Sequence, residues 1–253
     1  MVLGAQTYTV RAFTQSSADL RESLRRIARM GYTTVQLSAV GNMDARTLRD
    51  AADEAALKIV LTHIAEGRIL QDTAAVIAEH EILGCDYIGL GAMSERYRRA
   101  EWIDRFWLDF ERPAKMMRDA GKLFMYHNHN FEFGPLADGS RIIDRLMEIP
   151  SDLMGITLDT YWVQAAGCDV CDWIERLRGR IPCVHLKDMT CSGFETRMAA
   201  VGAGNMPFEK ILRALSDGGG VKYALVEQDD CYGQSPFDCL KASYDYLRGL
   251  GLK

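Results

Sequence analysis

Short apolar or β-branched runs alternate with longer amphipathic segments along the whole chain. In the first amphipathic segment Leu20, Leu24 and Ile27 recur at helical intervals, and Gly31 stands where a helix often ends. This alternation predicts strands over 2–8, 34–37, 59–63, 87–90, 123–127, 155–158, 183–186 and 223–226. It predicts helices over 17–30, 44–55, 70–83, 102–120, 140–147, 169–177, 207–216 and 236–247.

Eight strands, each followed by a helix, within 253 residues predict an α/β fold, a (β/α)8 TIM barrel. The alternative, an open doubly wound sheet, normally has a glycine-rich phosphate turn after an early strand. The nearest pattern here, Gly202-Ala-Gly204, precedes the seventh helix and lacks a third glycine. Since no linker or low-complexity stretch divides the chain, we expect residues 1–253 to form a single domain.

Composition and charge indicate which kinds of partner the protein binds and in which cellular compartment it is expected. Hydrophobic residues make up 48% of the chain, and 30 Lys+Arg against 35 Asp+Glu give a net charge of −5, which disfavours a nucleic-acid partner. No apolar run is long enough to span a membrane, and the first residues show no apolar signal region, so we expect a cytoplasmic protein. A homo-oligomer is left open.

Seven cysteines are an odd number in a chain of this length, so they predict free thiols rather than a disulfide framework. Cys168 and Cys171 form one CxxC pair, but a zinc site needs two further ligands and no second pair exists. We interpret this pair as two small residues near the start of a helix.

Polar side chains follow the ends of the predicted strands, where a TIM barrel builds its active site. Four of the five histidines lie at such positions, and the fifth, His80, lies inside a predicted helix and is expected at the surface. The strand-end candidates are His63, His127, His129, Glu132, Asp159, His185, Lys187 and Glu227. Because the strand ends of a barrel converge, we expect these side chains to share one site.

Three of these candidates are carboxylates, and bringing Glu132, Asp159 and Glu227 together without a cation would be unfavourable. With the His185 imidazole they form a ligand set that suits one divalent ion, Mn²⁺, Co²⁺, Zn²⁺ or Mg²⁺. Glu132 lies beyond its strand, so His127 is the alternative ligand there. Taken singly, Asp159 could be a helix N-cap and Glu227 part of a solvated loop, but their coincidence on consecutive strand ends favours a metal site.

The motifs around these residues resemble those of the sugar phosphate isomerase/epimerase family, the xylose isomerase-like TIM barrels, in a subgroup with a His-Asn-His sequence. The matching segments are 126–133 (YHNHNFEF), 158–162 (LDTYW), 184–188 (VHLKD), 202–208 (GAGNMPF) and 226–229 (VEQD). The resemblance implies a carbohydrate substrate and the metal ligands Glu132, Asp159, His185 and Glu227. The chain departs from the family's keto-sugar epimerases in having His127 where they place a glutamate. It also has Gln36 where a glutamate often ends strand two.

A site of this kind favours removal of a proton next to a carbonyl. We therefore expect a divalent-metal-dependent isomerase or epimerase that acts on a sugar or keto-sugar through an enediolate. The candidate acids and bases are Glu132, Glu227, His127 and His129. The candidate substrate contacts are His63, Trp162, Lys187, Tyr8 and Arg197.

Three other functions are weighed against this one. The paired histidines would also suit a metal-dependent keto-sugar or keto-inositol dehydratase or hydratase. A non-catalytic sugar-binding barrel would predict lost metal ligands, and an endonuclease IV-like repair enzyme would need more histidines and a basic face. A basic run, Arg96, Arg98 and Arg99, could bind a phosphate, although such a run is more commonly solvated.

Overall fold

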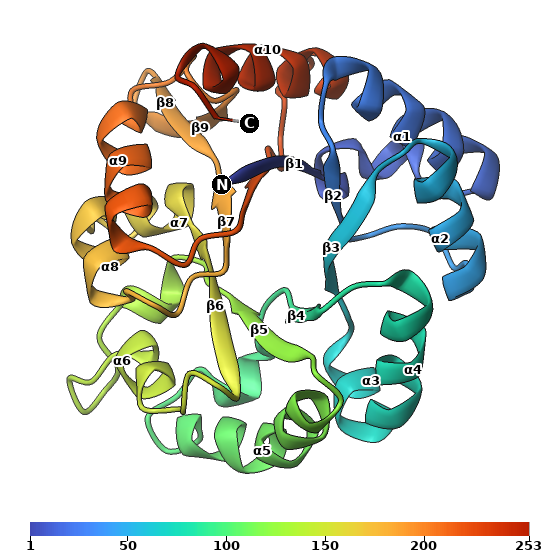
Figure 1. The fold of residues 1–253 in the computed structure, drawn as a ribbon. Helices are drawn as coiled ribbons and strands as arrows, with labels where there is room; N and C mark the ends of the chain where they lie inside the picture. The colour runs from blue at the N-terminus through green and yellow to red at the C-terminus, as the bar shows by residue number, and fades with distance from the viewer. Residues whose placement is uncertain (253) are drawn as a thin grey trace.

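Eight parallel strands close on themselves in the computed structural model, which describes residues 1–252 (Figure 1). Their order around the barrel is β1-β10-β7-β6-β5-β4-β3-β2. The strands are β1 (Val2–Gln6), β2 (Thr34–Leu37), β3 (Lys58–His63), β4 (Tyr87–Leu90), β5 (Leu123–His127), β6 (Met154–Asp159), β7 (Cys183–Leu186) and β10 (Tyr223–Val226). The predicted (β/α)8 TIM barrel is confirmed.

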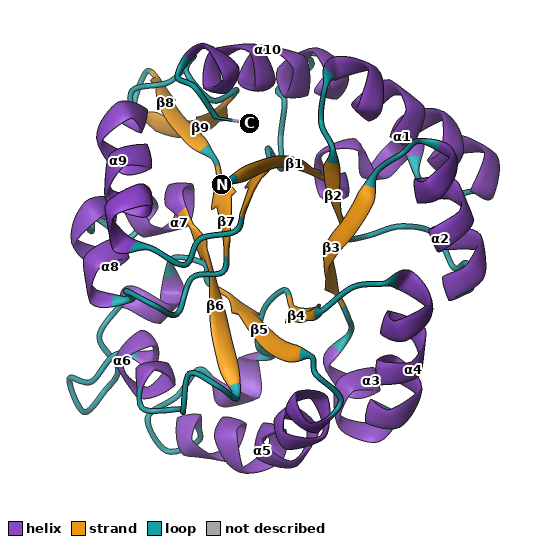
Figure 2. Cartoon of the chain, viewed as in Figure 1, coloured by secondary structure: helices purple, strands orange, loops and turns teal. Residues whose placement is uncertain are grey.

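Helices surround the barrel on the outside (Figure 2). They are α1 (Ser17–Met30), α2 (Ala45–Glu54), α3 (Glu66–Gln71), α4 (Thr73–Leu83), α5 (Ile103–Asp119), α6 (Ile142–Met147), α7 (Thr160–Ala165), α8 (Val170–Arg176), α9 (Phe208–Gly218) and α10 (Pro236–Gly249). Three 3₁₀ helices, η1 (Thr7–Phe13), η2 (Glu95–Tyr97) and η3 (Phe131–Phe133), lie in loops after strands. No helix within residues 1–252 is both long enough and apolar enough to cross a membrane.

Helix α1 shows how the sequence sets these boundaries. The Ser16 side chain accepts a hydrogen bond from the Asp19 backbone N–H at the start, and Gly31 ends the helix with a φ of 109°. Leu20, Leu24 and Ile27 are buried on one face against the barrel core. Burying each of these side chains stabilises the fold by about 1.5–3 kcal/mol.

An apolar layer fills the interior of the barrel below the site. It consists of Val60, Leu61, Tyr87, Met125, Cys183 and Leu225. Because side chains alternate along a strand, the residue two positions after an interior residue also points inward. Met125 is thus followed by His127, Cys183 by His185, and Leu225 by Glu227. This alternation carries the polar residues into the barrel mouth.

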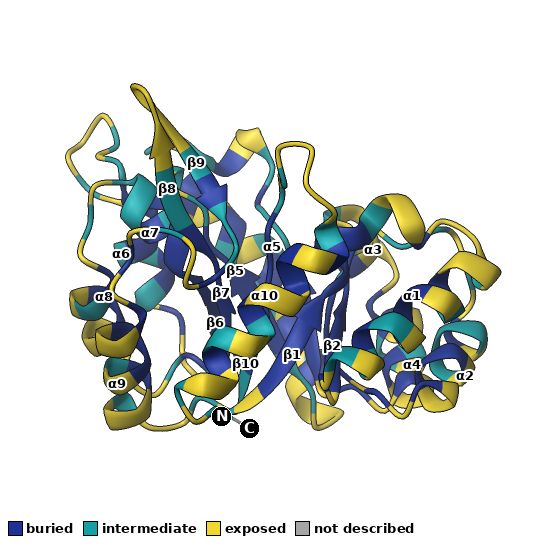
Figure 3. Ribbon diagram, turned by 90° about the horizontal axis from the view of Figure 1, so that it is seen from above, coloured by how far each residue is buried: buried dark blue, intermediate teal, exposed yellow. Residues whose placement is uncertain are grey.

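The loop after β7 contains a hairpin that the sequence did not predict. Strands β8 (Asp188–Ser192) and β9 (Glu195–Ala199) pair in antiparallel fashion and stand above the barrel, away from the chain's N-terminus (Figure 3). Gly193, with a φ of 60°, turns the hairpin at its tip, and the neighbouring Phe194 is fully exposed.

Two predicted elements differ from the structure, and one further helix was not predicted. The helix predicted over 70–83 is two helices, α3 and α4, because Asp72 leaves the helical conformation with φ −127° and ψ 36°. The first strand ends at Gln6, whose side chain accepts a hydrogen bond from the Tyr8 backbone N–H and starts η1. Helix α7, which directly follows β6, was not predicted.

The expectation that His80 lies at the surface was wrong, since its side chain on α4 is completely buried. Its Nδ1 lies 2.7 Å from the Val76 carbonyl oxygen, and its Nε2 lies 2.7 Å from the Thr62 hydroxyl in β3. These two contacts satisfy both ring nitrogens, so the imidazole is buried between α4 and the barrel without an unpaired polar atom.

Candidate metal centre and substrate cavity

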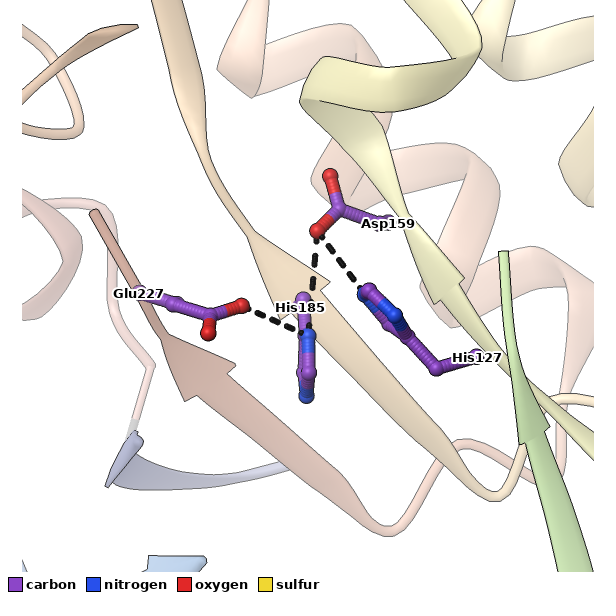
Figure 4. A group of neighbouring side chains, drawn as sticks. All are labelled: His127, Asp159, His185 and Glu227. Carbon is purple, nitrogen blue, oxygen red and sulfur yellow. Dashed lines mark hydrogen bonds and ion pairs between the residues drawn. The ribbon is translucent and has the colours of Figure 1, made fainter. Parts of the chain in front are cut away.

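Four buried side chains converge at the barrel mouth, three from β5, β6 and β7 and one from the residue directly after β10 (Figure 4). They are His127, Asp159, His185 and Glu227, and one ligand atom from each lies within 4.8 Å of the others. We call these four residues the ligand group. Two imidazole nitrogens and two carboxylates at this spacing could hold a metal ion.

The backbone fixes how His127 presents its ring to the ligand group. Its Nδ1 lies 2.9 Å from the Gly91 carbonyl oxygen, which can only accept a hydrogen bond, so Nδ1 carries a proton. The Nε2 atom faces the Asp159 Oδ2 at 3.1 Å. In the neutral imidazole, Nε2 therefore directs a lone pair at a carboxylate oxygen, an arrangement that a cation would stabilise.

The Gln36 side chain fixes the orientation of the His185 ring, as the Gly91 carbonyl does for His127. The His185 Nε2 lies 2.7 Å from the Gln36 Oε1 and donates to it, which leaves Nδ1 directed at the ligand group. Nδ1 lies 2.9 Å from the Glu227 Oε2, yet neither atom has a partner in hydrogen-bond geometry. Buried polar atoms without partners are costly, and a metal ion bound by both would remove that cost.

Asp159 has two roles, one for each carboxylate oxygen. Oδ1 caps α7 by accepting a hydrogen bond from the Trp162 backbone N–H, as the N-cap alternative anticipated. Oδ2 faces the ligand group. The Asn128 side chain accepts a hydrogen bond from the Asp159 backbone N–H at 3.0 Å, so the middle residue of the His-Asn-His sequence braces β6.

The Lys187 ammonium lies beside the ligand group and is buried. Its Nζ lies 3.2 Å from the Asp159 Oδ2, 3.0 Å from the Glu227 Oε2 and 2.8 Å from the Asp229 Oδ1. The ammonium is therefore ion-paired with three carboxylates, and it donates a hydrogen bond to the Asp229 Oδ2 at 2.9 Å. Three carboxylates and one ammonium leave two negative charges, which is the charge that a divalent cation neutralises.

These charges shift the pKa values of the group. Burial alone would raise the pKa of Asp159 and of Glu227, but the Lys187 ammonium together with the His185 and His127 imidazoles outweighs burial and holds both pKa values well below their usual range. Burial alone would lower the pKa of His185, but the nearby Glu227 and Asp159 raise it to about 8. A bound metal ion would take the place of that proton.

Glu132, the ligand that the family resemblance implied, lies outside the ligand group. Its buried carboxylate accepts hydrogen bonds from the Tyr126 hydroxyl at 2.7 Å and from the His129 backbone N–H at 2.8 Å. Burial raises the pKa of Glu132 to about 7. The turn at η3 directs this side chain back toward β5, so His127 occupies the position at which the sequence left two alternatives open.

A cavity of about 400 Å³ opens beside the ligand group. His127, Lys187 and Glu227 form part of its wall, and the other predicted residues that line it are His63, His129 and Tyr8. Burial lowers the pKa of His63 well below its usual range and that of His129 to about 3, so both imidazoles are neutral at pH 7. The four strand-end histidines form a cluster whose neighbouring ring centroids are 4.6–5.8 Å apart.

The remaining two predicted contacts do not line the cavity. Trp162, on α7, has its ring centroid 5.3 Å from that of His129 and 5.6 Å from the Lys187 Nζ, so it supports two residues of the wall. Arg197, on β9, pairs with Glu195 at 3.2 Å, and its guanidinium lies over the Tyr232 ring. It belongs to the hairpin rather than to the cavity wall.

The sequence analysis missed three residues that complete the site: Gln36, Asn128 and Asp229. Gln36 was noted only as a departure from the family's glutamate, and Asp229 only as the last residue of the matching segment 226–229; neither was assigned a role. The signal that could have found two of them is the same alternation that found the ligands, because Gln36 lies two residues after Thr34 on β2 and Asp229 lies two residues after Glu227.

The chain matches the Xylose isomerase-like TIM barrel family over residues 24–248, and it belongs to that family. The predicted family is thus confirmed, whereas the His-Asn-His subgroup stays a prediction. No curated protein matches the chain.

Solved structures with a similar fold share little sequence identity with the chain. A sugar phosphate isomerase/epimerase from Parabacteroides distasonis ATCC 8503 is 22% identical with a TM-score of 0.81, and the match covers 97% of this chain and 93% of that one. An L-ribulose 3-epimerase is 17% identical with a TM-score of 0.76 and coverage of 100% and 95%. The IOLI protein with a binding zinc atom is 14% identical with a TM-score of 0.72 and coverage of 99% and 98%. At these identities the likeness establishes the fold.

Proposed function

We propose that this protein is a divalent-metal-dependent isomerase or epimerase that acts on a sugar or keto-sugar through an enediolate. The observation that carries the proposal is the ligand group itself. Its nitrogen and oxygen atoms face one another while buried, and two of them, the His185 Nδ1 and the Glu227 Oε2, lack a hydrogen-bond partner. The names of two similar structures, a sugar phosphate isomerase/epimerase and an L-ribulose 3-epimerase, support the proposal, as does the zinc atom in the similar IOLI protein.

The donor set favours a borderline metal. Two imidazole nitrogens suit Mn²⁺, Co²⁺ or Zn²⁺ better than Mg²⁺, which prefers oxygen ligands and retains its water. His127, Asp159, His185 and Glu227 would hold one such ion, with Gln36 and the Gly91 carbonyl orienting the two imidazoles.

When bound, the cation supplies positive charge that stabilises the negative charge developing on a substrate oxygen as the neighbouring carbon loses its proton. Glu227 lines the cavity and stays ionised, because Lys187 holds its pKa low, so we assign it the removal of that proton. The protonated Glu227 returns that proton to the neighbouring carbon, whereas His129, neutral at pH 7, lines another part of the wall and would bind a substrate hydroxyl. Lys187 positions the carboxylates, since its ammonium lies within 3.2 Å of all three.

The second candidate, a keto-sugar or keto-inositol dehydratase or hydratase, rests on His129. Its Nδ1 is buried without a partner while its ring borders the cavity, so a substrate hydroxyl could complete that hydrogen bond. An imidazole placed at a departing hydroxyl would favour loss of water over return of the proton to carbon. Glu132 does not line the cavity, which leaves it a positioning role behind His129 in either reaction.

The experiment that tests this proposal follows solvent deuterium into substrate. The Mn²⁺-loaded protein is incubated in D₂O with D-ribulose, D-xylulose, D-fructose and 2-keto-inositol, and the sugars are analysed by NMR. We expect deuterium at the carbon next to the carbonyl of at least one sugar, together with an epimer or isomer. A chelator should abolish the exchange and Mn²⁺ should restore it, and Glu227→Gln should slow it about 10²–10⁴-fold.

Two other outcomes would contradict the proposal in different ways. Loss of water from the substrate, slowed by His129→Asn, would establish the second candidate. Sugar binding without any exchange or chemical change, in a protein that retains its metal, would establish the non-catalytic sugar-binding barrel. Lys241→Gln, on the exposed face of α10, serves as the matched surface control.

A further inference from the structure

We infer that the substrate of this cavity is an uncharged sugar and that the chain rejects the phosphate ester of the same sugar. The reaction acting on that sugar rests on the proposed function, whereas the choice between free sugar and phosphate ester rests on the charges around the cavity. A bound phosphate needs a cation or a cluster of free backbone N–H groups. Next to this cavity Lys187 and Arg96 are paired with carboxylates, and a carboxylate fills the N–H cluster. Arg11 and Arg98 donate to backbone carbonyls.

The cavity wall is acidic. Besides its imidazoles, the charged residues that line it are Glu66, Glu227, Asp229 and Lys187. Lys187 is the single cation among them, and its ammonium already contacts three carboxylates at 2.8–3.2 Å. A phosphate would have to displace one of these carboxylates to reach it.

The side of the cavity away from the ligand group carries a carboxylate where a phosphate-binding site would carry a cation. This side is built by the residues after β2, β3 and β4, and Glu66, at the start of α3, is its charged member. The Glu66 carboxylate accepts hydrogen bonds from the Ser94 backbone N–H and hydroxyl at 3.1 Å and from the Arg96 Nη2 at 2.8 Å. A phosphate on that side of the cavity would therefore meet the Glu66 carboxylate, while the Arg96 guanidinium is already paired with it.

The basic run at 96–99, which the sequence suggested as a phosphate site, does not face the cavity. Arg96 is paired with Glu66, and Arg98 donates to the Met93 carbonyl oxygen at 2.7 Å while its guanidinium lies over the Phe131 ring. Arg99 is exposed. None of the three lines the cavity.

The loop after β7 has a cluster of backbone N–H groups, but the chain fills it. In many TIM barrels the loops after strands seven and eight bind a phosphate. Here the buried Asp188 carboxylate accepts from the N–H groups of Met189 at 2.7 Å, Gly202 at 2.9 Å, and Gly204 and Met206 at 3.1 Å. Asp188 thus supplies internally the anion that a phosphate would otherwise provide.

One experiment compares each free ketose with its own phosphate ester in the exchange assay. For D-ribulose against D-ribulose 5-phosphate, and likewise for xylulose and fructose, we expect kcat/KM to favour the free sugar by at least about 100-fold. A phosphate ester processed faster than its free sugar would overturn the inference.

Glu66→Gln tests the specificity directly, because it removes the carboxylate and frees Arg96. We expect it to reduce the preference for the free sugar by about tenfold, mainly through a lower KM for the ester. Glu95→Gln is the matched control, since it makes the same charge change on the neighbouring η2 without touching the cavity, and it should leave the preference within about twofold.

A binding measurement separates this inference from the proposed reaction. Phosphorus NMR of the metal-free protein follows binding of ribulose 5-phosphate and of inorganic phosphate, so the readout needs neither turnover nor metal. We expect no saturable binding up to about 10 mM, which is weaker than the affinity of an ordinary specific site. Saturable binding near 1 mM or below overturns the inference, whatever reaction the protein catalyses. Failure of every sugar to exchange deuterium overturns the proposed function and leaves this result unaffected.

Discussion

Two histidines are buried in different surroundings. His185, inside the barrel, faces carboxylates, whereas His80, between α4 and the barrel, contacts only neutral groups. Both are completely withdrawn from solvent. His185 faces the Glu227 Oε2 at 2.9 Å and the Asp159 Oδ2 at 3.7 Å, and these carboxylates raise its pKa to about 8. His80 lies between the Thr62 hydroxyl and the Val76 carbonyl, and burial lowers its pKa to about 4.

The difference teaches that burial by itself does not mark a functional histidine. The Val76 carbonyl accepts from one nitrogen of His80 and the Thr62 hydroxyl donates to the other, so the neutral ring is complete within the fold. His185 has one nitrogen satisfied by Gln36 and the other aimed at carboxylates that also need a cation. The site is therefore recognised by buried polar atoms that have no hydrogen-bond partner within the fold. Three substitutions test this difference between the two histidines.

The largest effect is expected from Lys187→Gln. Removing the ammonium leaves the buried Asp159 and Glu227 and the partly exposed Asp229 together without their cation, so the metal-free variant should lose about 3–5 kcal/mol of unfolding free energy. Because a divalent ion would restore the charge balance, Mn²⁺ should raise Tm more in this variant than in the native protein. Urea unfolding and thermal melts measure both quantities.

Lys241→Gln is the control for that substitution, because Lys241 forms an exposed pair with Asp245 on α10. Its loss should change stability by less than about 1 kcal/mol. Equal stability of Lys187→Gln and the native protein would contradict the charge balance described for the site.

His80→Asn should alter how stability depends on pH. The pKa of His80 is about 4 in the folded protein against 6.5 for the free side chain, so the unfolded chain binds the proton more readily. The stability that neutral His80 contributes is present above pH 6.5 and is lost as the pH falls toward 4, by about 3 kcal/mol. The variant should lack this share of the acid destabilisation.

Urea unfolding at pH 7 and at pH 4 gives the two values to compare. Glu79, Lys122 and Arg68 are the charged groups around His80, and they are unchanged in the variant. If the native protein and His80→Asn lose equal free energy between the two pH values, the imidazole is not buried in its neutral form.

The smallest effect is expected from His63→Ala. His63 is intermediate between His80, whose two ring nitrogens both have partners, and His185 in the ligand group. Its Nδ1 lies 3.2 Å from the Ser38 hydroxyl, and its Nε2 is buried without a partner beside the cavity. If Nε2 binds a substrate hydroxyl, the substitution should raise KM about tenfold through one lost hydrogen bond. Metal content should stay unchanged, and a loss of metal would move His63 into the ligand group.

The barrel and the location of the candidate site could be predicted mainly from the alternation of side chains along the strands. Each side chain of the ligand group stands at the end of a strand, two positions after a buried residue in the cases of His127, His185 and Glu227. Because parallel strands in a barrel must end at one face, the convergence of these side chains follows from the fold. Both the barrel and the location of the site were therefore accessible before any coordinates.

Loop conformation and long-range contacts were not accessible in the same way. Glu132 lies in a turn, and hydrogen bonds from the Tyr126 hydroxyl and the His129 backbone N–H hold its carboxylate away from the ligand group. His80 lies on a helix whose sequence gives little distinction between its faces, so only the packing against β3 shows that it is buried. The β8–β9 hairpin likewise depends on backbone pairing that its polar residues do not signal.

Metal content tests the central claim most directly, because the claim names the four residues that hold the ion. Elemental analysis would compare the native protein with Asp159→Asn, His127→Ala and Glu132→Gln after incubation with Mn²⁺ or Zn²⁺ and removal of unbound metal. We predict about one equivalent in the native protein and in Glu132→Gln, with affinity reduced by at least about 100-fold in the other two variants. A native protein that stays metal-free, or a Glu132→Gln variant that loses its metal while His127→Ala retains it, would contradict the account.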